Sequence, residues 1–353
     1  MITKEENRKV VVGISGGVDS SVAATLLKKM GFSPVGVFMR FWGKENRCCN
    51  PEAERRARKV CGILKIPFYA VDARKEFKKS VVEYFIESYK RGDTPNPCVV
   101  CNREVKFKFL MEKLNSLEAD YIATGHYARL CREIRNSKFE TRKCEHKLLR
   151  GKDKEKDQSY FLWNLDKRWL SKIIFPLGDF KKKEVRKIAE KNGLPTAKTE
   201  ESQEVCFVEK STSDFLEKNI PFSPGKIVDR KGNIIGEHKG LFYYTQGQRK
   251  RIGLPGGPYY VFKKETRKNT LVVTKKEEDI SCKEVYYQKG NFFRKVTFPF
   301  QVKAQIRYKS RAETAVVEKG KVVFSSPQRA VTPGQSMVFY NGEELLGGGI
   351  IKE

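Results

Sequence analysis

A segment rich in glycine and serine near the start of the chain has the composition of an anion-binding loop. The residues Gly13-Ile14-Ser15-Gly16-Gly17-Val18-Asp19-Ser20-Ser21 follow an apolar run and precede a helical pattern. Adjacent glycines let the backbone turn sharply and aim N–H groups at one point, and a helix N-terminus adds partial positive charge. This combination predicts a phosphate site, with an ordinary capped turn as the alternative. A Walker lysine is missing, so Asp19 is predicted to hold a magnesium ion.

A pair of cysteines spaced as Cys-x-x-Cys is the second group that could do chemistry. Cys98 and Cys101 follow two prolines and precede a predicted helix that carries Arg103 and Lys106 near its start. A helix N-terminus and nearby cations favour thiolates, as in a redox pair. The same spacing is half of a zinc site, whose further ligands would be Cys131 with Cys144 or His146. Buried, inert cysteines are the third interpretation.

The composition is that of a folded, cationic protein. Its 353 residues include 71 Lys and Arg against 43 Asp and Glu, a net charge of +28, and 39% are hydrophobic. The apolar content excludes wholesale disorder, and the charge surplus predicts nucleic acid as a partner. No apolar run approaches the roughly 20 residues of a membrane span, and the N-terminal residues lack a signal-like stretch. The sequence therefore predicts a cytoplasmic protein with no membrane partner, whose nine cysteines are mostly reduced.

Short apolar runs alternate with longer amphipathic stretches in the first third of the chain. Strands are predicted at Lys9–Ile14, Pro34–Phe41, Phe68–Asp72 and Tyr121–His126, and helices at Val18–Met30, Pro51–Leu64, Lys75–Tyr89 and Arg103–Leu114. Strand–helix alternation implies right-handed crossovers, which give a doubly wound, mostly parallel α/β sheet. Ligands of such sheets bind at the carboxyl ends of the strands, so the site should lie in the loops that follow them.

The pattern changes twice further along the chain. Residues 131–157 are charged and weakly patterned, like an excursion or a flexible loop, and helices are predicted at Asp157–Leu165 and Lys181–Asn192. After Cys206, short strands between glycines and prolines predict a small mixed module. Alternating apolar and polar residues from Phe300 onward predict a C-terminal antiparallel β-barrel. These changes predict three domains, at residues 1–208, 209–279 and 280–353.

Several motifs resemble those of one enzyme family. Ser15-Gly16-Gly17-Val18-Asp19-Ser20 resembles the pyrophosphate loop of the ATP pyrophosphatases, which adenylate an oxygen atom and release pyrophosphate. Further segments are similar to the tRNA-specific 2-thiouridylases of that superfamily. These are Phe38-Met39-Arg40, residues 94–107 with the two cysteines, Thr124-Gly125-His126-Tyr127, residues 156–161, residues 202–207 with Cys206, residues 238–241, residues 244–250 and Pro333-Gly334-Gln335. The resemblance runs along most of the chain.

The resemblance implies ATP-dependent thiolation of a uridine in tRNA. ATP would adenylate the C2 oxygen of uracil and release pyrophosphate, and sulfur would then displace AMP. By position, Cys206 would carry a persulfide whose outer sulfur attacks, and Cys101 would attack the inner sulfur, leaving a disulfide bond. The sulfur would come from a cysteine desulfurase or a sulfur relay protein, or from sulfide. The family acts on the wobble uridine, U34, of tRNAs for Lys, Glu and Gln.

Other roles are implied at matched positions. Gly13 to Ser20, with Met39 and Gly125, would contact ATP, whereas Asn96, Pro97 and Cys98 would face the target base. The residues implied to contact tRNA are His126, Lys156, Asp157, Gln158, Arg307, Tyr308 and Gln335. Plainer interpretations are that Met39 is ordinary core and that Lys156 is a solvated cation.

One position departs from the family pattern, because many relatives have an aspartate where this chain has Cys98. Cys98, Cys101 and Cys206 could together ligate three irons of a [4Fe–4S] cluster, leaving the fourth iron to deliver sulfide. The sequence leaves this cluster and the persulfide relay as two open mechanisms.

Two other functions account for parts of the sequence. An amide-forming synthetase shares the pyrophosphate loop but usually takes ammonia from a Cys-His glutaminase, which is hard to assemble from His126, His146 and His238. A non-enzymatic RNA-binding protein with a structural zinc accounts for the charge and the cysteines, and leaves the loop unexplained.

Overall fold

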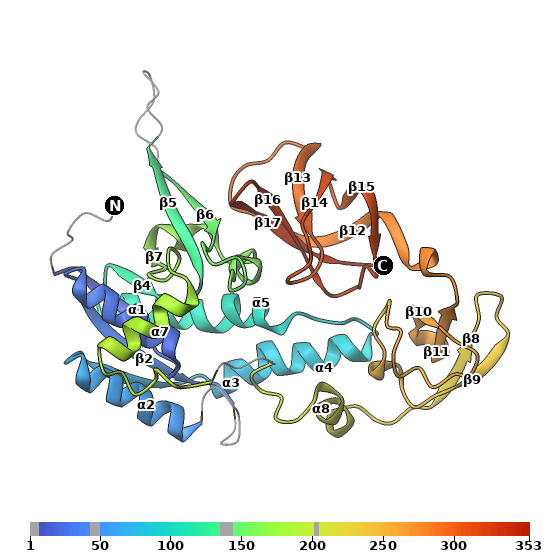
Figure 1. Ribbon diagram of the computed structural model, residues 1–353, viewed down its shortest axis with the longest axis horizontal. Helices are drawn as coiled ribbons and strands as arrows, with labels where there is room; N and C mark the ends of the chain where they lie inside the picture. Colours follow the sequence, from blue (N-terminus) through green and yellow to red (C-terminus); the bar gives the residue numbers. More distant parts are fainter. Residues whose placement is uncertain (1–6, 43–49, 135–143, 201–204) are drawn as a thin grey trace. The chain divides into compact units, whose positions relative to one another are not determined.

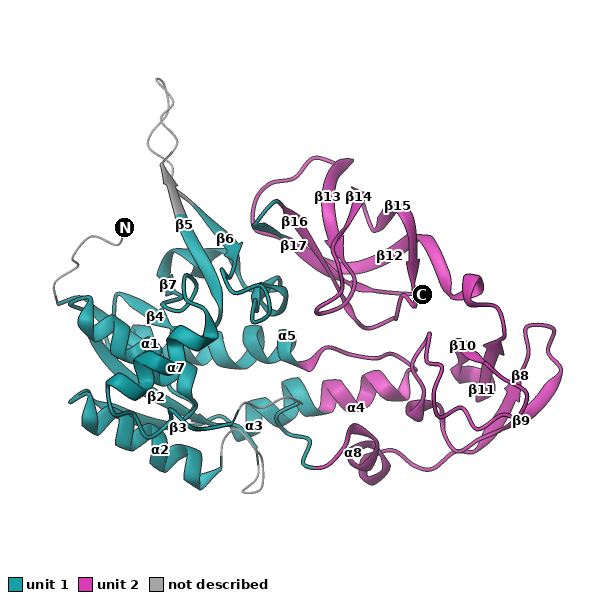
Figure 2. Ribbon diagram, viewed as in Figure 1, with its two compact units in different colours: residues 1–82, 98–209, 342–346 teal, residues 83–97, 210–341, 347–353 magenta. Residues whose placement is uncertain are grey.

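The computed structural model describes residues 7–42, 50–134, 144–200 and 205–353 (Figure 1). The chain divides into two compact units (Figure 2). Unit 1 comprises residues 1–82, 98–209 and 342–346, and unit 2 comprises residues 83–97, 210–341 and 347–353. Each unit is therefore assembled from segments that are separate in the sequence.

Unit 1 is built on a parallel sheet. Within the described residues, five strands pair in the order β3-β2-β1-β4-β7. Their bounds are Lys9–Gly13 for β1, Ser33–Arg40 for β2, Phe68–Asp72 for β3, Tyr121–Ala123 for β4 and Ile173–Ile174 for β7. The strand order reverses at β1, which pairs with β2 on one side and β4 on the other. In open α/β sheets the ligand crevice lies at the carboxyl ends of the strands at such a reversal.

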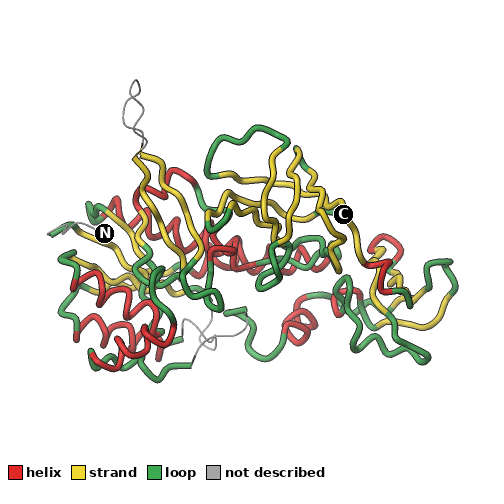
Figure 3. The backbone as a smooth tube through the Cα atoms, turned by 45° about the horizontal axis from the view of Figure 1, so that its top comes forward, coloured by secondary structure: helices red, strands yellow, loops and turns green. Residues whose placement is uncertain are grey.

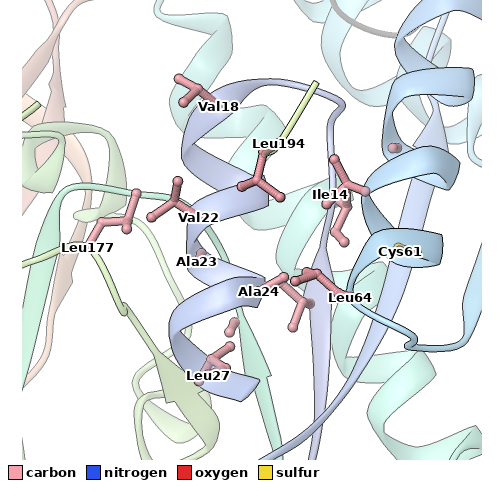
Figure 4. Close-up of a cluster of buried hydrophobic side chains, with 14 of the residues drawn as sticks. Ile14, Val18, Val22, Ala23, Ala24, Leu27, Cys61, Leu64, Leu177 and Leu194 are labelled. Carbon is pink, nitrogen blue, oxygen red and sulfur yellow. The ribbon is translucent and has the colours of Figure 1, made fainter. Parts of the chain in front are cut away.

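Helices cover both faces of this sheet. Their bounds are Val18–Lys29 for α1, Pro51–Ile63 for α2, Arg74–Phe77 for α3, Pro97–Cys101 for α5, Lys108–Ser116 for α6 and Lys182–Lys191 for α7. α1, α2 and α7 share one core cluster with Val10 and Val12 of β1, and Figure 4 shows Val22 and Leu27 of α1 in it. Because side chains alternate along a strand, Val11 points to the opposite face, on which α6 contacts β1 and β4.

A β-hairpin follows β4 in the sequence. β5 (Ala128–Ile134) pairs antiparallel with β6 (Cys144–Arg150). Of the two alternatives predicted over residues 131–157, the flexible loop is therefore wrong for these strands, because charged side chains suit a hairpin as well as they suit a loop. Residues 135–143 lie outside the described part of the chain.

The helix that carries the cysteines begins earlier than predicted. It starts at Pro97 rather than Arg103 and continues from α5 through a π-helical stretch, Asn102–Phe107, into α6. Proline suits the first turn of a helix, where its missing N–H would have no intrahelical partner. Cys98 therefore lies in the first turn of the helix and Cys101 about one turn later, and neither lies in front of the helix.

Unit 2 contains a small mixed sheet with its own core. Four of its described strands pair in the order β10-β11-β8-β9. Their bounds are Gly225–Val228 for β8, Ile234–His238 for β9, Tyr260–Glu265 for β10 and Thr270–Thr274 for β11. Ile227, Val261 and Leu271 are buried in this core. The helices of this unit are α4 (Glu83–Lys90) and α8 (Thr212–Asn219), and the rings of Phe85 and Phe215 bring them together with centroids 6.0 Å apart.

The last strands form an antiparallel barrel. In the described chain they pair in the order β12-β15-β14-β13-β16-β17, and β12 also pairs with β17, which closes the barrel (Figure 3). Their bounds are Ser281–Phe292 for β12, Phe300–Gln305 for β13, Glu313–Glu318 for β14, Lys321–Arg329 for β15, Ser336–Asn341 for β16 and Glu344–Ile351 for β17. The glycines of β17 permit close pairing with β12, since a Cβ at Gly347 would lie 2.0 Å from the Asn291 carbonyl oxygen.

The predicted fold class is confirmed, because a parallel α/β sheet is followed by a small mixed module and a closed antiparallel barrel. Further details differ from the predictions. The strand predicted to reach His126 ends at Ala123, the helix predicted over Asp157–Leu165 is a 3-10 turn at Ser159–Leu162, and β12 and β17 were not predicted. Within the described residues, no helix is long and apolar enough to cross a bilayer.

Truncating a buried side chain on α1 tests this core. Leu27 is 0% exposed, so Leu27→Ala should lower the free energy of unfolding of unit 1 by about 2–5 kcal/mol. Ile63 of α2 is 44% exposed, and Ile63→Ala should cost about 0.5 kcal/mol or less. Urea unfolding followed by circular dichroism measures both variants. Equal losses would contradict this placement of the core.

Candidate functional site

The glycine- and serine-rich loop joins the end of β1 to the start of α1. Gly17 is the N-cap of α1 and supplies no side chain to the N–H groups of the first turn. The serines instead fold the loop: the Ser15 N–H donates to Ser20 Oγ at 3.1 Å, and the Ser21 hydroxyl donates to the Gly17 carbonyl at 2.9 Å. The first-turn N–H groups of α1 therefore point out of a helix end without a capping side chain, which is the arrangement that binds anions.

Two glycines allow the backbone segments around this loop to approach closely. Gly16 has a φ of +76°, and a Cβ there would lie 2.2 Å from the Ala53 carbonyl oxygen. A Cβ at Gly125, directly after β4, would lie 2.7 Å from the Ser20 nitrogen. Larger residues at either position would therefore push α2 or the end of β4 away from the loop.

Asp19 is held by a lysine that lies far away in the sequence. Lys182 Nζ donates to both carboxylate oxygens of Asp19 at 2.7 Å, and the Tyr127 hydroxyl donates to Asp19 Oδ1 at 2.8 Å. The Lys182 side chain is only 10% exposed. Lys182 is the first residue of α7, where the helix dipole disfavours a cation. The ion pair with Asp19 therefore has to outweigh that repulsion.

This pairing bears on the magnesium predicted at Asp19. Both carboxylate oxygens already accept hydrogen bonds from Lys182, so the carboxylate could ligate a metal only if the ion pair opened. The arrangement of Asp19 does not fit a magnesium ligand as it stands. The structure instead places a cation, Lys182 Nζ, directly beside the loop.

A cavity of ≈ 200 Å³ lies at the carboxyl ends of β1, β2 and β4. Its lining includes the predicted residues Gly13, Ile14, Ser15, Asp19, Ser20, Met39, Gly125, His126 and Gln158. Gly16, Gly17 and Val18 belong to the same loop but do not line it. Apolar side chains such as Met39 and Phe41 combine here with hydroxyls and a carboxylate, which suits a nucleotide with a flat base and anionic phosphates.

Sequence reasoning missed several residues of this site. Phe41, Lys106, Leu110 and Thr124 also line the cavity, and Lys182 and Tyr127 hold Asp19. One signal could have indicated Lys182. A phosphate loop without its own lysine needs a cation from elsewhere, and a lysine at the start of a helix after the last parallel strand lies at the correct edge of the sheet.

His126 is an uncharged member of the cavity. Thr124 Oγ1 and His126 Nδ1 form a hydrogen bond of 2.8 Å, and the ring lies 5.8 Å from the ring of Phe107. Burial, aided by the charge of Lys106, lowers the pKa of His126 to about 3. His126 is therefore a neutral hydrogen-bonding group at neutral pH, and not a cation for a phosphate.

The side chains of Lys156, Asp157 and Gln158 lie in three different environments. The Asp157 carboxylate, 8% exposed, accepts from the Gly151 N–H at 2.9 Å and from the Ser159 hydroxyl at 3.0 Å. Gln158 Oε1 accepts from the Tyr127 N–H at 3.0 Å and lines the cavity, whereas Lys156 is partly exposed. Asp157 thus organises this loop from within, and the tRNA contacts assigned to the three residues stay predictions.

The helix that bears Cys101 reaches the cavity. Cys101 is 4% exposed, whereas Cys98, one turn earlier, is exposed. Lys106, which lines the cavity, lies five residues further along the same continuous helical segment. Asn102 Nδ2 donates to the Phe161 carbonyl at 3.0 Å, which ties the helix to the segment after Gln158.

Cys206 is linked to the same cavity by aromatic contacts. The ring of the next residue, Phe207, packs against Phe77 with centroids 5.8 Å apart, and Phe77 stacks on Phe41 at 5.2 Å. Phe41 lines the cavity. Residues 201–204, which precede this segment, lie outside the described part of the chain.

The thiols do not form a metal centre in this conformation. Among the described residues, no group of three or more His, Cys, Asp or Glu side chains is arranged to hold a metal ion. Cys98, Cys101 and Cys206 as placed therefore do not fit the ligand set of the predicted [4Fe–4S] cluster, and the zinc alternative finds no support in the described residues.

The remaining predicted residues lie in unit 2. Arg307 Nη2 donates to the Ala330 carbonyl at 3.0 Å, and Gln335 Nε2 donates to the Thr94 carbonyl at 2.8 Å. Both residues line a second cavity. Asn96, Pro97 and Tyr308 do not line it, and their roles stay predictions.

The strand order, the helix end without a capping side chain and the lysine-bound carboxylate define a nucleotide-binding α/β protein. Comparison with known proteins narrows this class. Family models described as tRNA methyl transferase HUP domain, tRNA methyl transferase PRC-barrel domain and aminomethyltransferase beta-barrel domain match residues 8–210, 213–275 and 282–351.

Curated relatives match almost the whole chain. The tRNA-specific 2-thiouridylase MnmA of Clostridium acetobutylicum is 43% identical over 98% of this chain and 100% of its own length. That of Carboxydothermus hydrogenoformans is 44% identical over 98% of each chain. A match to a solved 4-thiouridine synthetase–RNA complex with bound ATP covers 60% of this chain and 49% of that chain, at 19% identity and a TM-score of 0.38. The chain belongs to the tRNA-specific 2-thiouridylase family, which confirms the resemblance inferred from its motifs.

Removing the amine of Lys182 should weaken ATP binding. Lys182→Met takes away a charged donor at the loop, and hydrogen bonds to charged groups contribute about 1.5–3 kcal/mol, so the Kd should rise roughly 10- to 150-fold. Lys183→Met changes an exposed lysine of the same helix and should leave the Kd within about twofold. Isothermal titration calorimetry measures both. Equal effects of the two variants would show that Lys182 does not serve the nucleotide.

The neutral His126 makes stability depend on pH in a defined window. An unfolded histidine binds a proton below about pH 6.5, whereas folding holds the pKa of His126 at about 3. The unfolded state therefore binds more protons in between, and stability falls as the pH drops, by at most about 1.4 kcal/mol per pH unit. His126→Gln should show a shallower loss between pH 7 and pH 5 in urea titrations. Parallel curves for the two proteins would refute this role of burial.

Proposed function

We propose that this protein uses ATP to thiolate C2 of a uridine in tRNA. The proposal rests on one observation, the lining of the cavity beside the pyrophosphate loop. Lys106, from the helix that bears Cys101, and Phe41 both line this cavity. The ring of Phe41 stacks on Phe77, which packs against Phe207, the residue after Cys206. The helix that bears Cys101 and the segment that bears Cys206 are thus both connected to this cavity, which supports a shared role for the nucleotide and the two thiols. Membership of the 2-thiouridylase family supports the same reaction.

The first step is adenylation of the uracil oxygen. The C2 oxygen attacks the α-phosphorus of ATP, and the bond from that phosphorus to the bridging oxygen breaks, so pyrophosphate leaves with its electron pair. The first-turn N–H groups of α1 and Lys182 stabilise the negative charge that collects on pyrophosphate. Lys182 is kept at the loop by Asp19 before ATP arrives. Met39 and Phe41 provide apolar surface for the adenine.

The second step replaces the activated oxygen by sulfur. The outer sulfur of a Cys206 persulfide attacks C2, and AMP leaves with the former C2 oxygen. The Cys101 thiolate then attacks the inner sulfur, which breaks the sulfur–sulfur bond and leaves 2-thiouridine and a Cys101–Cys206 disulfide. A thiol reductant must reopen that disulfide before the next turnover. A persulfide donor protein, such as a cysteine desulfurase or sulfur relay protein, reloads Cys206.

The persulfide relay is preferred to the iron–sulfur mechanism. In the described part of the chain the three cysteines are not arranged as metal ligands, and Cys98 is exposed while Cys101 is buried. The relay needs two of these thiols, whereas a cluster held by three cysteines needs Cys98 as well. The fate of Cys98→Ser therefore distinguishes the two mechanisms.

The proposed target is the wobble uridine, U34, of tRNAs for Lys, Glu and Gln, on which the family acts. An anticodon base is unpaired and can be turned out of the loop into a protein pocket, and the net charge of +28 suits a polyanion. Asn96, Pro97 and Cys98 are proposed to face that base. His126, Lys156, Gln158, Tyr308 and Gln335 are proposed tRNA contacts.

The proposed domain division is 1–208, 209–279 and 280–353, and the three matched family segments support it. A cytoplasmic location is proposed with the function, since tRNA is met there. Two of the family models are described as methyl transferase domains. Methyl transfer would leave the ATP-type loop and the buried thiol without a role, so thiolation is favoured.

The proposed function is tested by the product and its dependence on two thiols. Unmodified tRNA incubated with the protein, ATP and a persulfide donor should yield 2-thiouridine, detected by mass spectrometry of the digested nucleosides, with one pyrophosphate per sulfur. Cys101→Ser and Cys206→Ser should each lower the yield at least 100-fold, about 2.7 kcal/mol in the barrier. Both should still release pyrophosphate when tRNA is added, because adenylation needs neither thiol.

Matched controls come from other cysteines. Cys131→Ser and Cys282→Ser remove exposed thiols that do not line the cavity beside the loop and should thiolate normally. Cys98→Ser should retain activity under the relay and lose it under the cluster mechanism. Methyl groups transferred from S-adenosylmethionine instead of sulfur, or pyrophosphate release that does not need tRNA, would overturn the proposal.

A further inference from the structure

Unit 2 contains a second cavity of ≈ 360 Å³, outside the nucleotide site. It lies where the loop before β10 meets the barrel residues around β15 and β16. Its lining consists of Thr94, Thr245, Gln246, Gly247, Gln248, Arg307, Arg329, Ala330, Thr332 and Gln335. We call it the polar cavity. Its volume is at the lower end of the roughly 300–1,000 Å³ found for small-ligand sites.

The polar cavity differs in chemistry from the cavity of unit 1. Its lining has two arginines and several amide or hydroxyl side chains, and its apolar members are the small residues Gly247 and Ala330. The nucleotide cavity, in contrast, has Met39, Phe41 and Leu110 as apolar walls. A ligand in the polar cavity must therefore gain affinity from charge and hydrogen bonds, and not from stacking of a base.

The arginines of the polar cavity are held in place with donors to spare. Arg307 Nη2 donates to the Ala330 carbonyl and to Thr332 Oγ1, at 3.0 and 3.3 Å. Arg329 Nε donates to Glu277 at 2.6 Å. A guanidinium has five N–H donors, so these contacts use only part of each group. Both residues are also exposed, so a large ligand can reach them.

The walls of the polar cavity are fixed, and one buried hydroxyl lines it. A Cβ at Gly247 would lie 2.1 Å from the Ala330 Cβ, so the loop and the barrel are in direct contact. Thr94 Oγ1 is buried and has no hydrogen-bond partner among the described residues. Buried hydroxyls are usually paired. A ligand that accepts from or donates to Thr94 would satisfy this group.

We propose that the polar cavity binds one phosphate and the adjoining ribose of the tRNA backbone. Arg307 and Arg329 would hold the phosphate, and the Thr94 hydroxyl with the amides of Gln246 and Gln335 would bond the ribose hydroxyls. This contact positions the RNA without reading its sequence. It deepens the proposed function, on which it rests for the identity of the RNA, and it adds Arg329, Gln246 and Thr94 to the tRNA contacts.

The salt dependence of tRNA binding tests the phosphate contact. Arg329→Gln in the full chain should raise the Kd for tRNA about three- to tenfold, and should lower the slope of log K against log salt by about 0.7–0.9, as expected for one lost phosphate contact. The control is Arg311→Gln, which removes the same charge from an arginine that is 90% exposed, pairs with Glu313 and does not line the cavity. It should stay within about twofold, and Arg329→Lys should restore part of the affinity.

The hydroxyl of Thr94 provides a second test that does not depend on charge. Thr94→Val should weaken tRNA binding about three- to tenfold with an unchanged salt slope, if the ribose uses this group. If nothing binds there, the variant should bind tRNA normally, because its hydroxyl is unpaired already. Thermal unfolding of each variant confirms that it folds, and ATP affinity should be unchanged in all of them.

Three results would overturn the polar-cavity assignment. One is equal salt slopes for Arg329→Gln and Arg311→Gln, and another is normal tRNA binding by Thr94→Val. The third is that AMP or inorganic phosphate at millimolar concentration displaces tRNA from the wild-type protein but not from the Arg329→Gln variant. This result would show that the polar cavity binds a free anion. Failure of the proposed function would give a different result. The Arg329 and Thr94 variants and the salt concentration would then affect tRNA binding as expected, but no 2-thiouridine would form.

Discussion

The ion pair between Asp19 and Lys182 is the interaction on which the nucleotide site depends. α1 and α7 are in contact, and each presents its N-terminal end at this point. Two helix N-termini carry like partial charges, and Lys182 adds a full positive charge to them. The negative charge of the Asp19 carboxylate balances these three positive charges, and the hydrogen bond from the Tyr127 hydroxyl fixes the orientation of the carboxylate. Without that carboxylate the same elements would repel one another.

This constraint keeps the donors of the site in place before any ligand is present. Anion sites work best when their donors are already in place, because no reorganisation is then needed at the moment of reaction. The loop serines hydrogen-bond to the loop itself, so the N–H groups of α1 keep their direction. The glycines at positions 16 and 125 let the neighbouring backbone approach closely enough to complete the site.

The sequence was informative where local chemistry determines structure, and less so where distant segments meet. The loop from Gly13 to Ser20, four of the parallel strands and the presence of a C-terminal barrel were predicted, because apolar periodicity and glycine placement are local signals. Lys182 was missed, since the partner of Asp19 lies 163 residues away. β17 was missed because its glycines resemble those of a turn. These glycines are needed because the backbone of β12 lies too close to β17 for larger side chains, and a local pattern does not show this. The hairpin of β5 and β6 was missed because exposed strands and loops share charged residues.

The interleaving of the two units along the chain has a consequence for dissecting this protein. Residues 83–97 are part of unit 2 although they interrupt unit 1, and residues 342–346 return to unit 1 after the barrel strands have begun. A fragment ending at residue 208 would contain α4 but not Phe215, which packs against the ring of Phe85. It would also lack residues 342–346 of unit 1. Neither unit can be removed by a single cut, so deleting one of them is expected to disrupt the fold of the other.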